Sequence, residues 1–592
     1  MRSIIAALLI AGTSLGPVPA VATPNAAPVA GAPFQRLATA YLNDRLRLHP
    51  SEATAFGNHL YDAQVNDLSA KGRARDVKFL RSTLGALERI DRSTLSRDEQ
   101  VDAALLANEL RYQLWQIETL QSWAWDPQLA NEIISGSLYT LAARDFAPWP
   151  TRLKSAIARM EQIPAMYEQM RASLMPARVP LIHAQTVARQ NGGVLDIVSE
   201  MLAPHRDTLS PADQRRFDAA VATLRQAVAQ QQQWLDHSLV PNAKGDFRLG
   251  SRLYDVKLAF ALVTDRTRTQ IKADAQRAFD ETRAEMLAIA RTVLKDRPGS
   301  PTAPENPTRA QANQLIAAAL QLTYDKRPAR DGVMAKAEET LRQATAFVRA
   351  KQLVSVPDTP VQIIEMPKFR QGAVVAYCDN PGPLEPQLGT FYAISPIPAD
   401  WTEQRATSFL REYNDYMLHE LSIHEAMPGH YLQIAHANAN LSPLRAVLAS
   451  GAFAEGWAVY AERMMADEGY LDRDPLFRLT VLKMRLRSIT NTLLDIGVHA
   501  EGMTQDRAMA LMTQDAFQQE REAAGKWIRA QISSAQLLDY FFGYSEHVAL
   551  RTEMEQKRGA GFDLKAYNDE VISHGTPPVR YVRALMTGAP ID

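Results

Sequence analysis

The sequence predicts a mainly helical protein with one small β insert, and three observations lead to this fold class. Over residues 34–350, apolar side chains recur at three- and four-residue spacing among charged and amide residues, the pattern of amphipathic helices. Residues 354–399 instead hold short β-prone runs between prolines and glycines, and we expect a small sheet or hairpin set there. Helical periodicity returns at about residue 402 and continues to the end of the chain.

Seven segments carry clear helical periodicity, and capping signals support two of them. Ser96 is followed three residues later by Glu99, and Ser210 by Asp213, as is typical of helix starts. The stretch 297–309 contains prolines at positions 298, 301, 304 and 307, so it cannot lie inside a regular helix. The predicted helices are 34–48, 71–91, 97–121, 151–174, 211–236, 266–295 and 331–350.

The N-terminus is typical of an export signal. Arg2 supplies a positive charge, residues 4–15 form an apolar stretch, and residues 20–22 give a small-x-small cleavage sequence. The apolar stretch is too short to span a bilayer, which takes roughly 20 residues. We therefore predict a signal peptide at 1–22 and a flexible lead-in at 23–33.

Composition narrows the classes of partner. The 65 basic and 66 acidic residues nearly balance, so nothing recruits nucleic acid, and no later apolar run predicts stable membrane insertion. The lone cysteine, Cys378, allows no intramolecular disulfide. We expect an exported protein of the bacterial periplasm, with a helical N-terminal region at 34–296, a linker at 297–309 and a metal-binding region at 310–592, together forming one enzymatic unit.

Four of the 12 histidines fall between residues 419 and 436, a density that indicates a metal site. Imidazole is the commonest protein ligand for zinc, and a zinc hydrolase needs a neighbouring carboxylate as general base. We expect His424 and His430 to be ligands and Glu425 to be the base. His419 stays open as a ligand in place of His430, because His419 and His424 form an overlapping His-Glu-x-x-x-His sequence.

The spacing of the two histidines departs from the usual His-Glu-x-x-His pattern. Six residues turn an ideal helix by about 600°, which would leave His430 about 120° away from His424. Pro428 has no N–H for the carbonyl of His424, and Gly429 tolerates unusual backbone angles. A bulged turn at these two residues would bring His430 round to the metal.

Glu455 is the predicted third ligand, because it lies 25 residues after His430 on an apolar stretch with helical character. Two histidines from one helix and a glutamate from a following helix form the gluzincin arrangement, which leaves the fourth metal position open for water. Glu462, two turns later, is expected to orient a ligating histidine by a hydrogen bond on the side away from the metal. Gln433 is expected to support the site, and His436 to be an ordinary helix-face residue.

Three further residues are candidates to stabilise the oxyanion that forms when water attacks a carbonyl. His499 lies one turn after Asp495, and the pair is either functional or buried and mutually satisfied. Tyr540 and Tyr544 also lie one turn apart, and either phenol could donate, although tyrosines are common in helical cores.

Three motifs and two longer stretches of the chain resemble a known family. The sequences HEAMPGHYLQ (424–433), AEGWAVYAE (454–462) and LDIGVH (494–499) resemble the bacterial "domain of unknown function 885" family, as do residues 49–69 and 562–586. The resemblance implies a zincin-like, gluzincin-type helical fold. It also implies a zinc site at His424, His430 and Glu455, with Glu425 as base.

The chain departs from this family at three places. Asn491 stands where the family usually has an arginine, residues 567–569 (YND) replace a Phe-His-Asp, and residues 533–536 (SSAQ) replace a stretch like Pro-Gly-Gln-Ala. If the arginine normally holds a substrate carboxylate, specificity would differ in this protein.

The expected function is a zinc-dependent, metallopeptidase-like hydrolase with one zinc ion per chain. It would cleave amide bonds of short peptides with metal-activated water and Glu425 as general base. Residues 354–399 could form an edge along which an extended peptide lies. Two alternatives stay open: a metal-dependent hydrolase of non-peptide amides or esters, and a non-catalytic binding or scaffold protein with a vestigial metal site.

Overall fold

Helices form most of the part of the chain that the structure describes. The computed structural model covers residues 32–366, 376–398, 401–437 and 442–591, so the predicted signal peptide lies outside the described residues. None of the described helices is long and apolar enough to cross a membrane. The mainly helical fold predicted from periodicity is confirmed.

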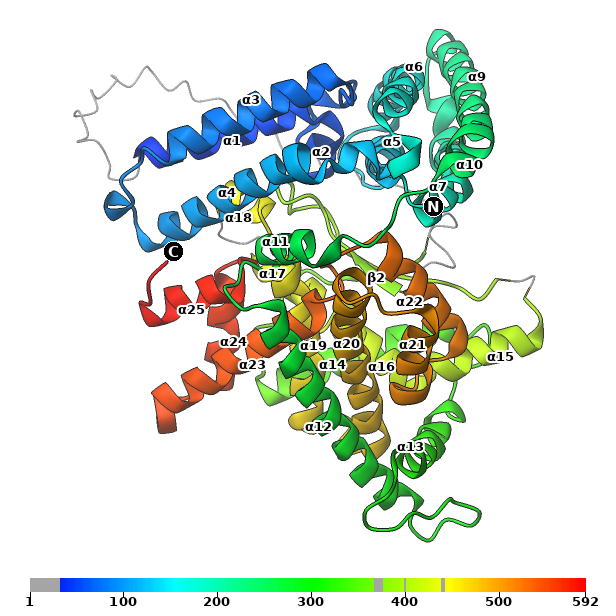
Figure 1. Cartoon of the computed structure of the whole chain (residues 1–592), viewed down its shortest axis with the longest axis vertical. Coiled ribbons are helices and arrows are strands. Elements are labelled where there is room, and N and C mark those ends of the chain that lie inside the picture. Colours follow the sequence, from blue (N-terminus) through cyan, green and yellow to red (C-terminus); the bar gives the residue numbers. More distant parts are fainter. Residues whose placement is uncertain (1–31, 367–375, 399–400, 438–441, 592) are drawn as a thin grey trace, which may run out of the picture.

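The N-terminal helices lie mostly in the upper part of the view in Figure 1. Ser96 begins one of them with a reciprocal capping box. The Ser96 hydroxyl accepts from the Glu99 N–H, and the Glu99 carboxylate accepts from the Ser96 N–H. The helices are α1 (Ala32–Leu48), α2 (Pro50–Ala55), α3 (Ala70–Leu87), α4 (Arg97–Trp115), α5 (Pro127–Ala142), α6 (Trp149–Ser173), α7 (Leu181–Gln190), α8 (Gly193–Ile197), α9 (Pro211–Trp234), α10 (Val240–Asn242) and α11 (Gly250–Leu262).

Three longer helices follow: α12 (Arg268–Leu294), α13 (Arg309–Tyr324) and α14 (Val333–Lys351). The Pro-rich stretch 297–309 connects α12 to α13, as its prolines require. All seven segments predicted to be helical are helices in the structure, namely α1, α3, α4, α6, α9, α12 and α14. Before the β insert, the structure also has α2, α5, α7, α8, α10, α11 and α13, which the periodicity did not single out.

Three short strands form the β insert: β1 (Gln362–Glu365), β2 (Ala376–Asp379) and β3 (Phe391–Ile394). β3 is central, pairing in parallel with β1 and antiparallel with β2. The prediction of a small sheet within 354–399 is confirmed, although residues 367–375 and 399 lie outside the described part. β2 contacts α16 (Asp415–Glu425), so the sheet lies against the helix that carries the first predicted ligand.

The remaining helices build the lower part of the molecule in Figure 1 and its right-hand and left-hand flanks. They are α15 (Glu403–Glu412), α16, α17 (His430–Ala437), α18 (Pro443–Val447), α19 (Gly451–Asp467), α20 (Pro475–Ala500), α21 (Gln505–Ala510), α22 (Glu520–Ile532), α23 (Asp539–Arg558), α24 (Leu564–Ser573) and α25 (Val579–Thr587).

The core of this region is the pair α19 and α23, with α20 beside both. Gly456 on α19 faces Gly543 on α23 so closely that a Cβ on either would collide with the backbone of the other helix. Trp457 and Phe453 on α19 are fully buried in the same cluster. This close packing holds the α19 backbone rigidly, and α19 carries Glu455 and Glu462.

Candidate metal centre

A break in the helix accommodates the six-residue spacing between His424 and His430. α16 ends one residue after His424, and α17 begins at His430 itself. In the turn between them, the carbonyl oxygen of Pro428 accepts a hydrogen bond of 2.9 Å from the indole nitrogen of Trp457. The sequence predicted a bulge at this point, whereas the structure has a turn that separates two helices.

Gly429 is required in this turn because the backbone folds closely on itself. Its N–H donates to the carbonyl oxygen of Ile423 at 2.9 Å, and the Met427 N–H donates to Ser422 at 2.9 Å. A Cβ on Gly429 would collide with the carbonyl oxygens of Ile423 and His424. The turn therefore admits no side chain at this position without a backbone shift.

Three predicted ligands converge where α16, α17 and α19 meet. The Nε2 atoms of His424 and His430 lie 3.6 and 3.5 Å from Oε2 of Glu455. The two imidazole rings are nearly perpendicular, at 86°, with centroids 4.8 Å apart. The three side chains are 15, 14 and 22% exposed, so water and a substrate can reach this cluster.

The cluster fits a zinc ion. Tetrahedral zinc with bonds of roughly 2.0–2.1 Å holds neighbouring ligand atoms about 3.3–3.4 Å apart, close to the two distances observed here. Oε2 of Glu455 is buried and has no hydrogen-bond partner among the described residues. A buried carboxylate oxygen without a donor is costly, and a cation between it and the two imidazoles would satisfy it.

Glu462 supports His424 from the side away from the cluster, as the sequence predicted. Its Oε1 accepts from Nδ1 of His424 at 2.6 Å, which fixes the ring with Nε2 facing Glu455. Glu420 was missed, yet it offers an oxygen within 4.8 Å of the Glu462 and His424 ligand atoms. Burial, and then the Glu462 carboxylate, raises the pKa of Glu420 well above its ordinary value. Its i,i+4 spacing from His424 was the available signal.

The charges around the cluster favour a cation. Burial acts to lower the pKa of His424, but Glu455 and Glu462 outweigh it and raise this pKa well above its ordinary value. Burial acts to raise the pKa of Glu455, but His424 and His430 outweigh it and lower that pKa strongly. Glu455 is therefore ionised, and its negative charge attracts a cation to this point.

Glu425 is held by the β insert, a contact that the sequence did not predict. Its Oε2 accepts a hydrogen bond of 3.0 Å from the backbone N–H of Cys378 in β2. Only the tertiary fold brings these residues together, so neither local pattern nor spacing could have indicated the contact. The edge of the sheet thus orients the predicted base directly after the first predicted ligand.

The two tyrosines on α23 have different surroundings. The Tyr540 hydroxyl accepts from Arg529 at 3.3 Å, and its pKa is raised by burial and then by the Glu455 carboxylate. Tyr544 is buried, accepts from Arg463 at 2.8 Å, and lines a small cavity with Glu462. Tyr540 is therefore the phenol on the Glu455 side, and Tyr544 packs behind α19.

His499 and Asp495 have structural contacts, and the oxyanion role considered for His499 is not supported. Nε2 of His499 faces the carbonyl oxygens of Ala530 and Ser533, at 2.8 and 2.7 Å, at the end of α22. Asp495 accepts from the Tyr254 hydroxyl at 2.7 Å and from two backbone N–H groups in the following turn. Both side chains are buried and hold this turn, but they do not bond to each other.

Two other polar residues near the motif face away from the cluster. Nδ1 of His419 bonds to the Tyr470 hydroxyl at 2.9 Å, and burial lowers the pKa of His419 to about 4. Among the described residues, His419 belongs to no group of potential metal ligands. Gln433 is fully buried and donates to the Thr576 hydroxyl at 2.9 Å, so it anchors α17 from behind.

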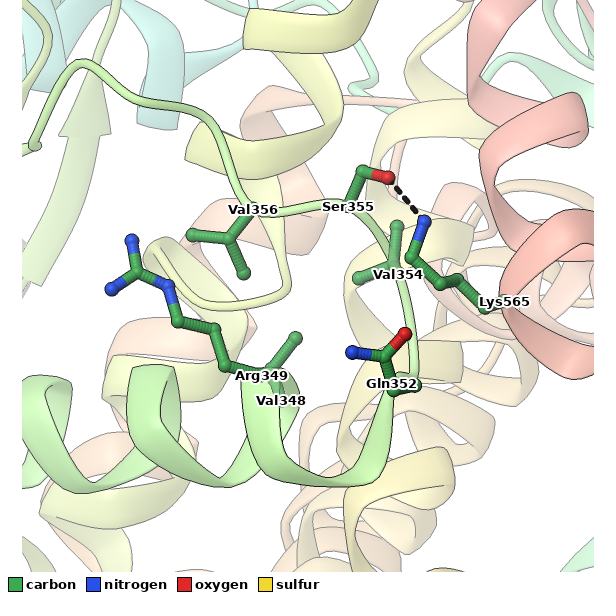
Figure 2. Close-up of a pocket in the computed structure, with 7 residues that line it drawn as sticks. All are labelled: Val348, Arg349, Gln352, Val354, Ser355, Val356 and Lys565. Carbon is green, nitrogen blue, oxygen red and sulfur yellow. Dashed lines mark hydrogen bonds between the residues drawn. The ribbon is translucent and has the colours of Figure 1, made fainter.

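A surface pocket of about 260 Å³ lies at the end of α14, shown in Figure 2. In it, Lys565 donates to the Ser355 hydroxyl at 2.5 Å and to Asp569 at 2.7 Å. Lys565 thus forms an ion pair with Asp569, one turn later on α24. His436 lies 2.7 Å from the Ser355 carbonyl oxygen, which ties α17 to this loop. The pocket is lined by Val348, Arg349, Gln352, Val354, Ser355, Val356 and Lys565.

The fold and the cluster define a mainly helical protein whose two histidines and glutamate meet at a helix break. The chain belongs to the family described as bacterial proteins of unknown function (DUF885), whose model matches residues 50–586. No curated protein matches the chain.

Two solved structures are similar over nearly the whole chain. A "putative lipoprotein of unknown function" from Shewanella oneidensis is 32% identical, with a TM-score of 0.80, over 93% of this chain and 99% of its own. A "putative lipoprotein" from Colwellia psychrerythraea is 17% identical, with a TM-score of 0.76, over 93% and 98%. The second likeness concerns the fold alone.

Proposed function

We propose that this protein is a zinc-dependent hydrolase of the metallopeptidase type, with one zinc ion per chain. The observation that carries the proposal is the convergence of His424, His430 and Glu455 at the spacing of tetrahedral ligands. Two histidines and one glutamate leave a fourth position for water, which is the pattern of catalytic rather than structural zinc. Glu425, the residue after the first ligand, supplies the carboxylate that a structural site would not need.

The side chains have separate roles in this proposal. When bound, zinc would lower the pKa of its water to about 7 and polarise the scissile carbonyl. Glu425, oriented by the Cys378 N–H, takes the proton of the attacking water and passes it to the leaving amine. The Tyr540 hydroxyl, on the Glu455 side of α23, donates to the developing oxyanion.

The β insert offers a place for an extended peptide. β2 is an edge strand, and its Cys378 N–H already faces Glu425, so a peptide along this edge would pass the base. The Ala376 N–H points to the same edge, because N–H groups two residues apart in a strand share a direction. Ala376→Pro removes this donor and should raise KM for peptides; an unchanged KM would argue against the docking edge.

We further propose an extracytoplasmic location. Residues 1–22 have the pattern of an export signal, and the two similar structures are described as lipoproteins. A periplasmic location would suit a hydrolase of short peptides.

The test compares wild type with Glu425→Gln, both starting at residue 23. Elemental analysis should find about one zinc per chain in each, because Glu425 is not a proposed ligand. Mass spectrometry of a short-peptide library should show cleavage by wild type, and a loss of about 10²–10⁴-fold in Glu425→Gln. Absence of zinc from both proteins would refute the proposal. Zinc in both with cleavage of esters or non-peptide amides alone would point to the alternative hydrolase.

A further inference from the structure

Lys526 on α22 differs from the other buried cations of the described part of the chain. Six lysine and arginine residues there are no more than 8% exposed, and five of them bond to oxygen acceptors. Lys526, 7% exposed, makes no hydrogen bond or ion pair with any described residue. The five bonded cations are Arg152, Arg159, Arg283, Arg445 and Lys483.

The glutamate one turn from Lys526 on the same helix already has a partner. Glu522, one turn earlier on α22, forms an ion pair with Arg487. Burial, and then Arg487 and Arg529, lowers the pKa of Lys526 well below its ordinary value. A buried lysine beside two arginines, without its own anion, is an unfavourable arrangement that an added carboxylate would relieve.

Arg529 extends this cationic region toward the metal centre. It lies three residues after Lys526, on the same face of α22. Its Nη2 donates to Gln536 at 2.7 Å and to the Tyr540 hydroxyl at 3.3 Å, both neutral acceptors. No described carboxylate lies within ion-pair distance of Arg529. Asp539 is nearby, where burial and then Glu455 raise the pKa of its carboxyl well above its ordinary value and so disfavour its charged form.

Both cations lie beside the proposed zinc ligands. Arg529 donates to the Tyr540 hydroxyl, and Tyr540 lies one turn before Gly543 on α23. Gly543 packs directly against Gly456, the residue after Glu455. A peptide with its scissile bond at the cluster would therefore have one end near Lys526 and Arg529.

We infer that Lys526 and Arg529 form a subsite for the C-terminal carboxylate of a short peptide, so that cleavage falls near the C-terminus of the substrate. The inference rests on the proposed function, which it makes more specific. A carboxylate would give Lys526 the counter-charge that it lacks and would match the two-donor geometry of the Arg529 guanidinium. Tyr540 would then stand between this subsite and the cluster.

The test measures binding, in a Glu425→Gln background that preserves the peptide. The probes are Ac-Ala-Phe-Ala as free acid, the same peptide as C-terminal amide, and Ac-Ala-Asp-Ala amide. We expect the free acid to bind at least tenfold more tightly than both amides. Lys526→Met should abolish this preference, while Lys526→Arg should retain most of it. Arg521→Met, which removes an exposed cation on the same helix, is the control and should leave it unchanged.

Stability gives a second readout. A lysine with a purely structural role would lower the melting temperature when replaced, whereas Lys526→Met should raise it in the absence of peptide, because an unpaired buried cation is removed. The inference is overturned if acid and amide bind equally, if none of the probes binds, if the aspartyl amide binds as tightly as the free acid, or if Lys526→Met keeps the preference. A free-acid preference that depends on Lys526 in a protein that cleaves nothing would support the subsite and refute the proposed function.

Discussion

At the residue scale, the site depends on side chains that bond to other site residues. His424 presents Nε2 to the cluster because Glu462 holds its Nδ1 at 2.6 Å. Glu425 is oriented in the same way, by a backbone N–H of the β insert. The orientations of one predicted ligand and of the predicted base thus follow from two hydrogen bonds that lie outside the cluster itself.

Glu462→Gln tests the first of these bonds. Loss of the carboxylate weakens the orientation and the basicity of His424, so zinc affinity should fall about 10–100-fold. Competition with a zinc chelator measures the change in Kd. Glu468→Gln, at the end of the same helix and with a side chain that makes no described hydrogen bond, is the matched control. Equal Kd values for the two variants would show that Glu462 does not support the site.

Sequence pattern was sufficient for residues whose partners are side chains of a recognisable chemical type. His424, His430, Glu455 and Glu462 could be selected from spacing and chemical type alone. His499 could not be judged in this way, because its Nε2 is engaged by backbone carbonyl oxygens, which every residue has and which no sequence pattern marks. The unpaired state of Lys526 likewise depends on which carboxylates the fold brings near it.

At the element scale, the turn between α16 and α17 is the feature that makes the histidine spacing workable. A continuous helix would separate the two imidazoles by about 120°. The turn instead lets a new helix, α17, begin at His430. Trp457 on α19 stabilises this turn by donating a hydrogen bond to the Pro428 carbonyl oxygen. The sequence indicated the position of this break through Pro428 and Gly429, but not that it would divide the segment into two helices.

Gly429→Ala tests the turn. The added methyl group would collide with two carbonyl oxygens, so unfolding free energy should fall by roughly 1–3 kcal/mol and zinc affinity should fall with it. The control is Gly192→Ala, where a Cβ meets nothing within 4 Å. Urea unfolding and zinc titration give both quantities. The account would be contradicted if the Gly429→Ala protein were as stable as the control and bound zinc as tightly.

A helix could be predicted from the sequence where one of its faces is buried and the other is exposed. Amphipathic helices such as α3 and α12 were identified because one face is polar. The β-prone runs predicted a sheet, but not that β1 would pair in parallel with β3. That pairing depends on the path of the connecting chain, about which the composition of each run says nothing.

At the scale of the whole molecule, buried ion pairs join the N-terminal helices to the metal-binding region. Arg445 on α18 is 3% exposed and bonds to Asp102 on α4 at 2.6 Å and to Asp98 at 2.9 Å. Burial raises the pKa of Asp102, although Arg445 opposes the shift. The sequence suggested one enzymatic unit, and this contact is one physical reason to expect the two regions to unfold together.

Arg445→Met tests this connection. It would leave Asp102 buried without its cation, so we expect a loss of about 3–5 kcal/mol in unfolding free energy. Arg216→Met, which breaks an exposed pair with Glu161, should change stability by no more than about 1 kcal/mol. Thermal and urea unfolding measure both. Similar small losses in the two variants would mean that the buried pair does not hold the regions together.

The measurement that tests the central claim most directly is anomalous diffraction at the zinc absorption edge, from crystals of the zinc-loaded protein. The account predicts one strong peak at roughly 2.0–2.2 Å from Nε2 of His424, Nε2 of His430 and an oxygen of Glu455. A peak at another place, or no peak at these three side chains in zinc-saturated crystals, would contradict the proposed metal centre.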